Sequence, residues 1–189
     1  YRLYRRYIAA DLEPFLELEG VALAGVKTSR RMRFELNWAH GSISLGQLRK
    51  LERTFAQASP EAVRVVVAHH PLLQPETTSS VPMRLVRRSD LALRHFAALG
   101  VRLVLSGHFH LSYVRRHETE IAEGAPTGAR EAASAPILVA QAASTISTRL
   151  RGEPNAYNLI DIDAGAIIVT VREWQGEGWV TRERAAAET

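Results

Sequence analysis

Two short apolar runs, each followed at once by a histidine cluster, constrain this chain more than any other feature. Residues 63–68 precede the His-His-Pro segment 69–71, and residues 101–105 precede the Gly-His-Phe-His segment 107–110. Runs of this length that are rich in β-branched residues and end near Gly or Pro are typical of buried strands in parallel sheets. Since ligands bind beyond the carboxyl ends of such strands, the placement indicates a metal site.

The segments between these runs predict helices. Apolar residues recur at helical spacing over residues 45–55, Ser44 is the expected N-cap, and Pro60 ends this helical region. A second helix is predicted to begin at a Ser89 cap and to end before Gly100. Between the first strand and the second helix, several prolines favour a loop. The alternation of helix and strand therefore predicts an α/β fold with a mostly parallel sheet.

The remaining apolar segments complete the predicted fold. Further strands are expected at residues 21–28, 111–117 and 137–142, and a hairpin is expected from residues 157–162 and 167–171. Residues 118–136 are expected to form a mobile connection, and residues 182–189 a flexible tail. No repeat or internal boundary is evident, so residues 1–189 are predicted to form a single domain.

Composition narrows the possible chemistry. The chain has 189 residues, 46% of them hydrophobic, which suffices for one domain with a sizeable core. It contains no cysteine, so disulfides, thiolate zinc sites and a cysteine nucleophile are excluded, and His, Asp, Glu and Asn are the candidate ligands. The absence of cysteine agrees with a reducing compartment, and we expect a cytoplasmic protein.

Charge and hydropathy indicate which partners the chain can have. No apolar stretch approaches roughly 18 residues, so no membrane span is expected. The net charge of +4 comes from short, scattered arginine clusters that are not interleaved with aromatic residues. Solvated faces explain these clusters better than nucleic-acid binding does. The sequence predicts no oligomeric state.

The spacing of the second cluster suits metal chemistry. His108 and His110 are two residues apart, so an extended chain would place both rings on one face. If Gly107 bends the chain, the two rings could instead serve two metal ions, which lie about 3.5–4 Å apart in two-metal hydrolytic sites. Isolated histidines are more often ordinary polar residues, and His40, His95 and His117 are interpreted in this way. Asp161 and Asp163 alternate with isoleucines and are expected on a solvated strand face.

Together the two clusters resemble the later motifs of the calcineurin-like metallophosphoesterases, which are His-x-Pro after one strand and Gly-His-x-His after the next. The resemblance implies a sandwich of two mixed sheets flanked by helices, of which this chain supplies the C-terminal part. It also implies that His69 and His108 ligate one metal and that His110 ligates the other. His70 occupies the variable motif position, which suits either a contact behind the ligands or ordinary packing.

A third segment, residues 144–155, looks like the closing region of the subgroup that includes cyclic nucleotide phosphodiesterases. Within it, Arg149 and Arg151 are candidates for contacting a phosphate or for an exposed loop. The family's earlier motifs, Asp-x-His, Gly-Asp-x-x-Asp and Gly-Asn-His followed by an acid, are absent from this sequence. By the resemblance, the bridging carboxylate and the asparagine ligand would lie upstream of Tyr1.

The resemblance therefore implies a metal-dependent phosphoester hydrolase with a centre of two divalent ions (Mn, Fe or Zn) and a small-molecule phosphoester as substrate. This chain alone would be inactive, because it lacks the carboxylates of the centre. One alternative is a truncated, inactive member that serves as a binding or regulatory module, and another is a purely structural set of histidines. Loss of the first strands would uncover sheet edges and apolar surface, so the isolated chain is expected to be unstable or to associate.

Overall fold

The computed structural model describes residues 1–29, 41–76, 83–119, 135–148, 150, 152–163 and 166–188. Its helices are α1 (Arg2–Tyr7), α2 (Leu45–Phe55) and α3 (Ser89–Ala98). The larger sheet contains β1 (Phe15–Leu18), β2 (Val21–Val26), β3 (Val63–Ala68), β4 (Val101–Ser106), β5 (Tyr113–His117) and β6 (Ile137–Gln141). The smaller sheet contains β7 (Ala156–Ile162), β8 (Ala166–Trp174) and β9 (Trp179–Glu188).

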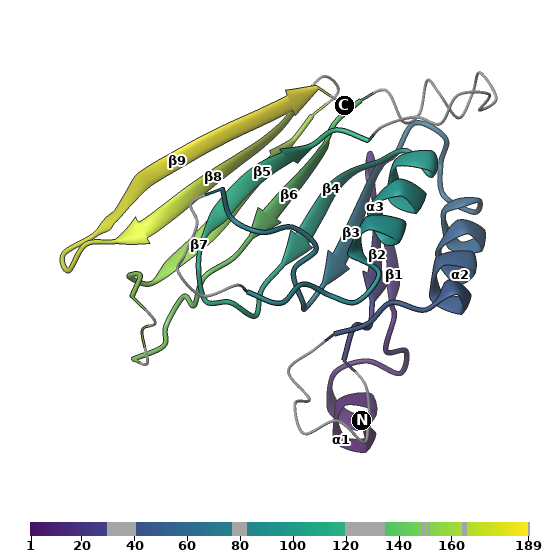
Figure 1. The fold of residues 1–189 in the computed structure, drawn as a ribbon, viewed down its shortest axis with the longest axis horizontal. Helices are drawn as coiled ribbons and strands as arrows, with labels where there is room; N and C mark the ends of the chain where they lie inside the picture. The colour runs from purple at the N-terminus through teal and green to yellow at the C-terminus, as the bar shows by residue number, and fades with distance from the viewer. Residues whose placement is uncertain are drawn as a thin grey trace.

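The larger sheet has the order β1-β2-β3-β4-β6-β5 (Figure 1). Its four central strands, β2, β3, β4 and β6, are parallel, and the edge strands β1 and β5 run antiparallel to their neighbours. The predicted α/β class and the mostly parallel arrangement are therefore confirmed. The short helix α1 and the edge strand β1 were not predicted, because neither carries a strong periodic apolar pattern.

Alternate residues of the central strands face two different layers. Val66 and Val104 are buried in one core with the apolar sides of α2 and α3. Their neighbours Val65 and Leu103 are buried in a second core with Ile167 of the smaller sheet. The chain thus forms a helical layer, a six-stranded sheet and a three-stranded sheet. Figure 1 shows β7, β8 and β9 on one side of the view and the two longer helices on the other.

Two details differ from the sequence prediction. The smaller sheet is antiparallel throughout rather than mixed, because β7, β8 and β9 follow one another through hairpins. The predicted flexible tail is wrong for residues 182–188, which pair with β8 as the end of β9. Backbone pairing holds these residues although their composition is charged and alanine-rich. The predicted connection 118–136 lies mostly outside the described residues.

The helix ends follow capping rules with one exception. Ser44 Oγ accepts a hydrogen bond from Gln47 N at 3.2 Å, and Gln47 Oε1 accepts one from Ser44 N at 2.9 Å, so α2 begins with a complete capping box. Ser89 was predicted to cap α3, but it is the first helical residue, and Arg88 at φ +69° is the cap. Gly100 ends this helix region at φ +68°, where only glycine is unstrained. Among the described residues, no helix has the length and apolar character to cross a membrane.

One part of the larger sheet is left without a covering layer. On β1 and β3, the side chains of Leu16, Leu18 and Val67 are 54%, 55% and 40% exposed. A mostly apolar cleft of about 520 Å³ opens beside them and reaches His69. Because exposed apolar area and an unpaired edge favour association, we expect the apparent mass to rise with concentration. Sedimentation velocity over a concentration series checks this, and a constant monomer mass would contradict it.

Candidate metal centre

The histidine clusters lie at one edge of the larger sheet because the strands that precede them are parallel neighbours. β3 ends at Ala68 and β4 ends at Ser106, and the two strands pair in parallel. The backbone N–H of Gly107 donates to the carbonyl of His69 at 3.0 Å, which joins the two chain segments directly after the strands. The predicted convergence of the two clusters at the carboxyl end of the sheet is therefore observed.

Three imidazoles form a compact group at this edge. His69 Nε2 and His108 Nδ1 lie 3.2 Å apart, and the ring of His70 has its centroid 4.5 Å from that of His108. One ligand nitrogen from each of the three residues lies within 4.8 Å of the other two. His69 is exposed, His108 is half-buried and His70 is buried. The residue given the weakest role by the sequence is thus a full member of the group.

His110 lies beside this group rather than in it. It lines a pocket of about 240 Å³ together with His69 and His108. Its Nδ1 lies 2.6 Å from the hydroxyl oxygen of Ser144, which follows β6. The expected roles of His69, His108 and His110 as ligands of two ions stay a prediction. In the part of the chain that the structure describes, only His69, His70 and His108 form a group of this kind.

The backbone at the second cluster is strained. His108 has φ +83° and His110 has φ +61°, and Arg88 is the one other described non-glycine residue with positive φ. The left-handed region costs an L-residue about 1–2 kcal/mol, and such strain persists where the surroundings or the function require it. The strained turn places the imidazoles of His108 and His110 at the pocket. A chain that stayed in extended conformation would run past the pocket instead.

This strain predicts an unusual order of stability among variants. At position 110, His110→Gly is expected to be more stable than His110→Ala by about 0.5–1 kcal/mol, because relief of the positive φ outweighs the entropy that glycine loses on folding. At the neighbouring Phe109, which does not have positive φ, alanine should be the more stable choice. Urea unfolding of the four variants measures this. If alanine is the more stable residue at position 110 as well as at position 109, the turn at His110 relaxes without cost.

A buried side-chain amide, that of Gln141, supports the strained turn. Gln141, at the end of β6, is fully buried. Its Oε1 accepts a hydrogen bond from Ser106 Oγ at 2.8 Å, and its Nε2 donates to the carbonyl of Gly107. This role was not predicted from the sequence, although a glutamine that ends an otherwise apolar strand is a usable signal. The side-chain amide of Gln141 therefore holds the peptide bond between Gly107 and His108 in place.

Two further residues hold His70, and neither was identified from the sequence. Thr28, just beyond β2, is 1% exposed, and its Oγ1 lies 2.7 Å from His70 Nδ1. The same Oγ1 accepts a hydrogen bond from the backbone N–H of His70 at 3.2 Å. Gly41 lies so close that a Cβ there would be 2.5 Å from His70 Cγ. The ring therefore has one permitted position between Thr28 and Gly41.

The electrostatic environment favours the neutral form of one of the imidazoles. His69 is exposed as a whole residue, but its ring packs edge-on against the rings of His70 and His108. Desolvation is the main cause that lowers the pKa of His69 below its usual value near 6.5, and the nearby charge of His110 lowers it further. A neutral imidazole is the form that binds a metal ion.

The same direction of shift predicts how folding depends on pH. Desolvation also lowers the pKa of His117, against a smaller opposite effect of Asp90. Both histidines therefore take up protons more readily in the unfolded chain, so the free energy of unfolding should fall as the pH drops below about 6.5. We expect the melting temperature of the metal-free chain to fall from pH 7 to pH 5. The fall should be smaller in His117→Gln, and an equal fall would contradict this assignment.

The other residues considered from the sequence lie away from the group or outside the described residues. Asp161 is exposed on β7, as expected. His95 Nε2, on α3, contacts the carbonyl of Leu48 on α2 at 3.2 Å, which is an ordinary contact between two packed helices. Three positions lie outside the described residues: His40, Arg149 and Arg151. Their expected roles are therefore neither supported nor opposed.

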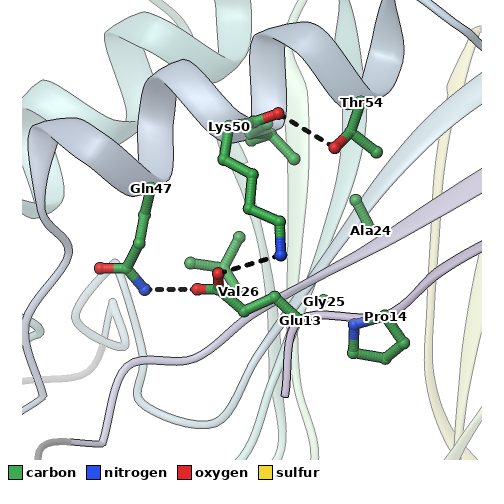
Figure 2. Close-up of a pocket in the computed structure, with 9 residues that line it drawn as sticks. Glu13, Pro14, Ala24, Gly25, Val26, Gln47, Lys50 and Thr54 are labelled. Atoms are coloured by element: carbon green, nitrogen blue, oxygen red, sulfur yellow. Dashed lines mark hydrogen bonds and ion pairs between the residues drawn. The ribbon is translucent and has the colours of Figure 1, made fainter. Parts of the chain in front are cut away.

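A third and much smaller space, beside α2, is structural. Figure 2 shows Gln47 and Lys50 pointing from the helix towards Glu13. Gln47 Nε2 donates to Glu13 Oε1 at 2.6 Å, and Lys50 Nζ lies 3.4 Å from Glu13 Oε2. The volume left between them is about 10 Å³, about the size that one water occupies. These contacts hold the segment before β1 against α2 and leave no room for a ligand.

The three imidazole nitrogens that His69, His70 and His108 offer fit a single transition-metal ion. Neutral imidazoles suit Zn²⁺, Ni²⁺ or Cu²⁺, whereas Mg²⁺ and Mn²⁺ favour oxygen ligands. No Asp or Glu belongs to this group within the described ranges, so the described residues alone do not complete a two-metal centre. No family model and no curated protein matches this chain.

Proposed function

We propose that this chain carries part of the metal centre of a phosphoester hydrolase of the calcineurin-like metallophosphoesterase kind. The observation that supports the proposal is that histidines following two neighbouring parallel strands line one pocket of about 240 Å³. This is the arrangement that the His-x-Pro and Gly-His-x-His segments imply. When bound, divalent ions would activate a water for attack on phosphorus and neutralise charge on the phosphoryl oxygens.

The residues of this chain contribute binding and orientation. In the proposal, His69 and His108 hold one ion, and their 3.2 Å separation keeps both rings at the pocket. His110 holds the second, with its Nδ1 against Ser144 Oγ at 2.6 Å. A hydrogen bond at one ring nitrogen fixes the orientation of the ring and leaves the other nitrogen as the ligand atom. The substrate proposed is a small-molecule phosphoester that fits the pocket beside Ser144.

The test measures hydrolysis of bis(p-nitrophenyl) phosphate with Mn²⁺ or Zn²⁺. It compares the 189-residue chain with the same chain extended by the residues that its gene encodes before Tyr1. We expect turnover in the extended protein and its loss in His69→Ala and His108→Ala, with His95→Gln as a control that keeps turnover. An extended protein that binds the metal but releases no nitrophenol would contradict the proposal.

A second candidate is a binding or regulatory module that lacks turnover. The observation that favours it is the absence of a carboxylate from the histidine group among the described residues. Without a carboxylate to bridge two ions, this group would hold a single ion, which could bind a phosphate but would lack the second ion of a two-metal hydrolytic centre. Inorganic phosphate should then bind the metal-loaded chain in calorimetry, and the extended protein should show no hydrolysis. Turnover in the extended protein would exclude this candidate.

A further inference from the structure

His70 is placed by the structure as one of three converging imidazoles. Its ring centroid lies 4.5 Å from that of His108 and 4.9 Å from that of His69. His110, which the family resemblance favours as a ligand, lies outside this group and contacts Ser144. We propose that His69, His70 and His108 bind one divalent ion of the zinc type, and that Thr28 is the residue that positions His70.

The separation of the nitrogens suits such an ion. In a tetrahedral zinc site with Zn–N bonds of about 2.0–2.1 Å, two ligand nitrogens lie about 3.3 Å apart. His69 Nε2 and His108 Nδ1 already lie 3.2 Å apart. One nitrogen from each of the three rings lies within 4.8 Å of the other two, so no separation in that set exceeds the tetrahedral one by more than about 1.5 Å.

Thr28 occupies one ring nitrogen of His70, so the proposed ligand atom is the other. Its Oγ1 is buried and lies 2.7 Å from Nδ1, so the ligand nitrogen of His70 is Nε2. A neutral imidazole that binds through Nε2 carries its proton on Nδ1, where it donates to the threonine oxygen. The backbone N–H of His70 donates to the same oxygen at 3.2 Å, which fixes the start of the side chain as well.

Close packing removes the alternative positions of the ring. Gly41 lies against it so tightly that any Cβ would overlap Cγ and Nδ1 of His70, at 2.5 and 2.6 Å. The carbonyl of Gly41 accepts a hydrogen bond from Arg87 N at 2.9 Å, so the glycine backbone is itself held in place. A ring that is buried, hydrogen-bonded on one edge and packed on one face is preorganised, which lowers the cost of binding.

The ligand chemistry sets the class of ion. Three neutral nitrogens favour Zn²⁺, Co²⁺, Ni²⁺ or Cu²⁺ over Mn²⁺, Mg²⁺ and Ca²⁺. Three protein ligands also leave a fourth position for water or substrate, as in catalytic zinc sites. This site goes beyond the proposed hydrolase, because it needs no residue outside this chain and would exist equally in a binding module.

The decisive experiment compares two matched histidine variants. The 189-residue chain, His70→Ala and His110→Ala are titrated with Zn²⁺ in competition with a chromophoric chelator, and thermal melts establish that each is folded. We expect His70→Ala to weaken Zn²⁺ binding more than about 100-fold, beyond the 10–100-fold typical of residues behind the ligands. His110→Ala should change binding of this ion less than about 3-fold, because His110 belongs to the second ion of the proposed hydrolase, and Mn²⁺ should bind more weakly than Zn²⁺.

Two results of this titration would overturn the inference. If His110→Ala loses Zn²⁺ and His70→Ala retains it, our inference is overturned while the proposed hydrolase keeps the ligands that its resemblance implies. If the unsubstituted chain binds no Zn²⁺, our inference is also overturned, and hydrolysis by the extended protein still decides the proposed function separately. The two proposals therefore fail on different measurements.

A second pair of variants tests Thr28 without removing a ligand. Thr28→Val keeps the shape of the side chain and removes the oxygen, so Zn²⁺ binding should weaken by about 10–100-fold. Thr28→Ser keeps the oxygen and should stay within about 3-fold of the unsubstituted chain. If both variants bind Zn²⁺ as tightly as the unsubstituted chain, Thr28 does not position His70.

Discussion

Replacing His108 with alanine is expected to weaken Zn²⁺ binding by this chain more than about 100-fold, which is the upper range for residues that only support a ligand. His108 Nδ1 lies 3.2 Å from His69 Nε2, and its ring also packs against that of His70. Its loss leaves two imidazoles, too few to hold the ion against water. His69→Ala should have the same effect.

This prediction is independent of which histidine is the third ligand. His69 and His108 belong both to the ligand set that the family resemblance implies and to the group in the structure. His95→Gln is the matched control, since His95 contacts the carbonyl of Leu48 and glutamine can keep that contact. Equal Zn²⁺ affinity in all four proteins, measured by chelator competition, would show that the histidines are structural.

The position of the site was predictable from the sequence because it depends on chain topology. The runs before His69 and Gly107 are short, apolar and separated by a helical pattern, which favours parallel neighbouring strands. Parallel neighbours end at the same edge, so the two clusters had to lie near each other. Their 3.2 Å approach follows from this topology together with the bond between Gly107 N and His69 O.

The individual role of each histidine was not predictable in the same way. His70 follows His69 directly, and in a regular strand the two side chains would point to opposite faces. The chain leaves the strand at Ala68, so the alternation no longer applies. His108 and His110 adopt positive φ, which a sequence pattern does not reveal for non-glycine residues. Local backbone conformation therefore decides which rings meet.

The supporting residues were missed because their contacts are long-range. Thr28 lies 42 positions before His70, and Gln141 lies 35 positions after Ser106. Gln141 ends an apolar strand, and Thr28 lies in a polar stretch just beyond another, so the sequence explains both equally well as surface residues. The polar residues that end neighbouring parallel strands lie at one edge, so these residues become candidates only when the strand order is known.

Gly41→Ala is expected to destabilise the chain by about 1–3 kcal/mol, the usual cost of overpacking. The added Cβ would lie 2.5 Å from His70 Cγ, and His70 is buried, so the ring or the backbone must move. Neither moves easily, because Thr28 holds the ring and Arg87 N holds the carbonyl of Gly41. If His70 is a ligand, the same change should weaken Zn²⁺ binding.

Gly46→Ala is the matched control, because the same methyl group there meets open space. Its Cβ would have only Ser44 Oγ nearby, at 3.9 Å, which is ordinary contact. Gly46 is the second residue of α2, where alanine still restricts the unfolded chain more than glycine does, so this variant should be at least as stable as the unsubstituted chain. Urea unfolding and Zn²⁺ titration of both variants measure the contrast. Equal stability of the two variants would mean that the packing around His70 is loose, and a loosely packed ring would not be preorganised for an ion.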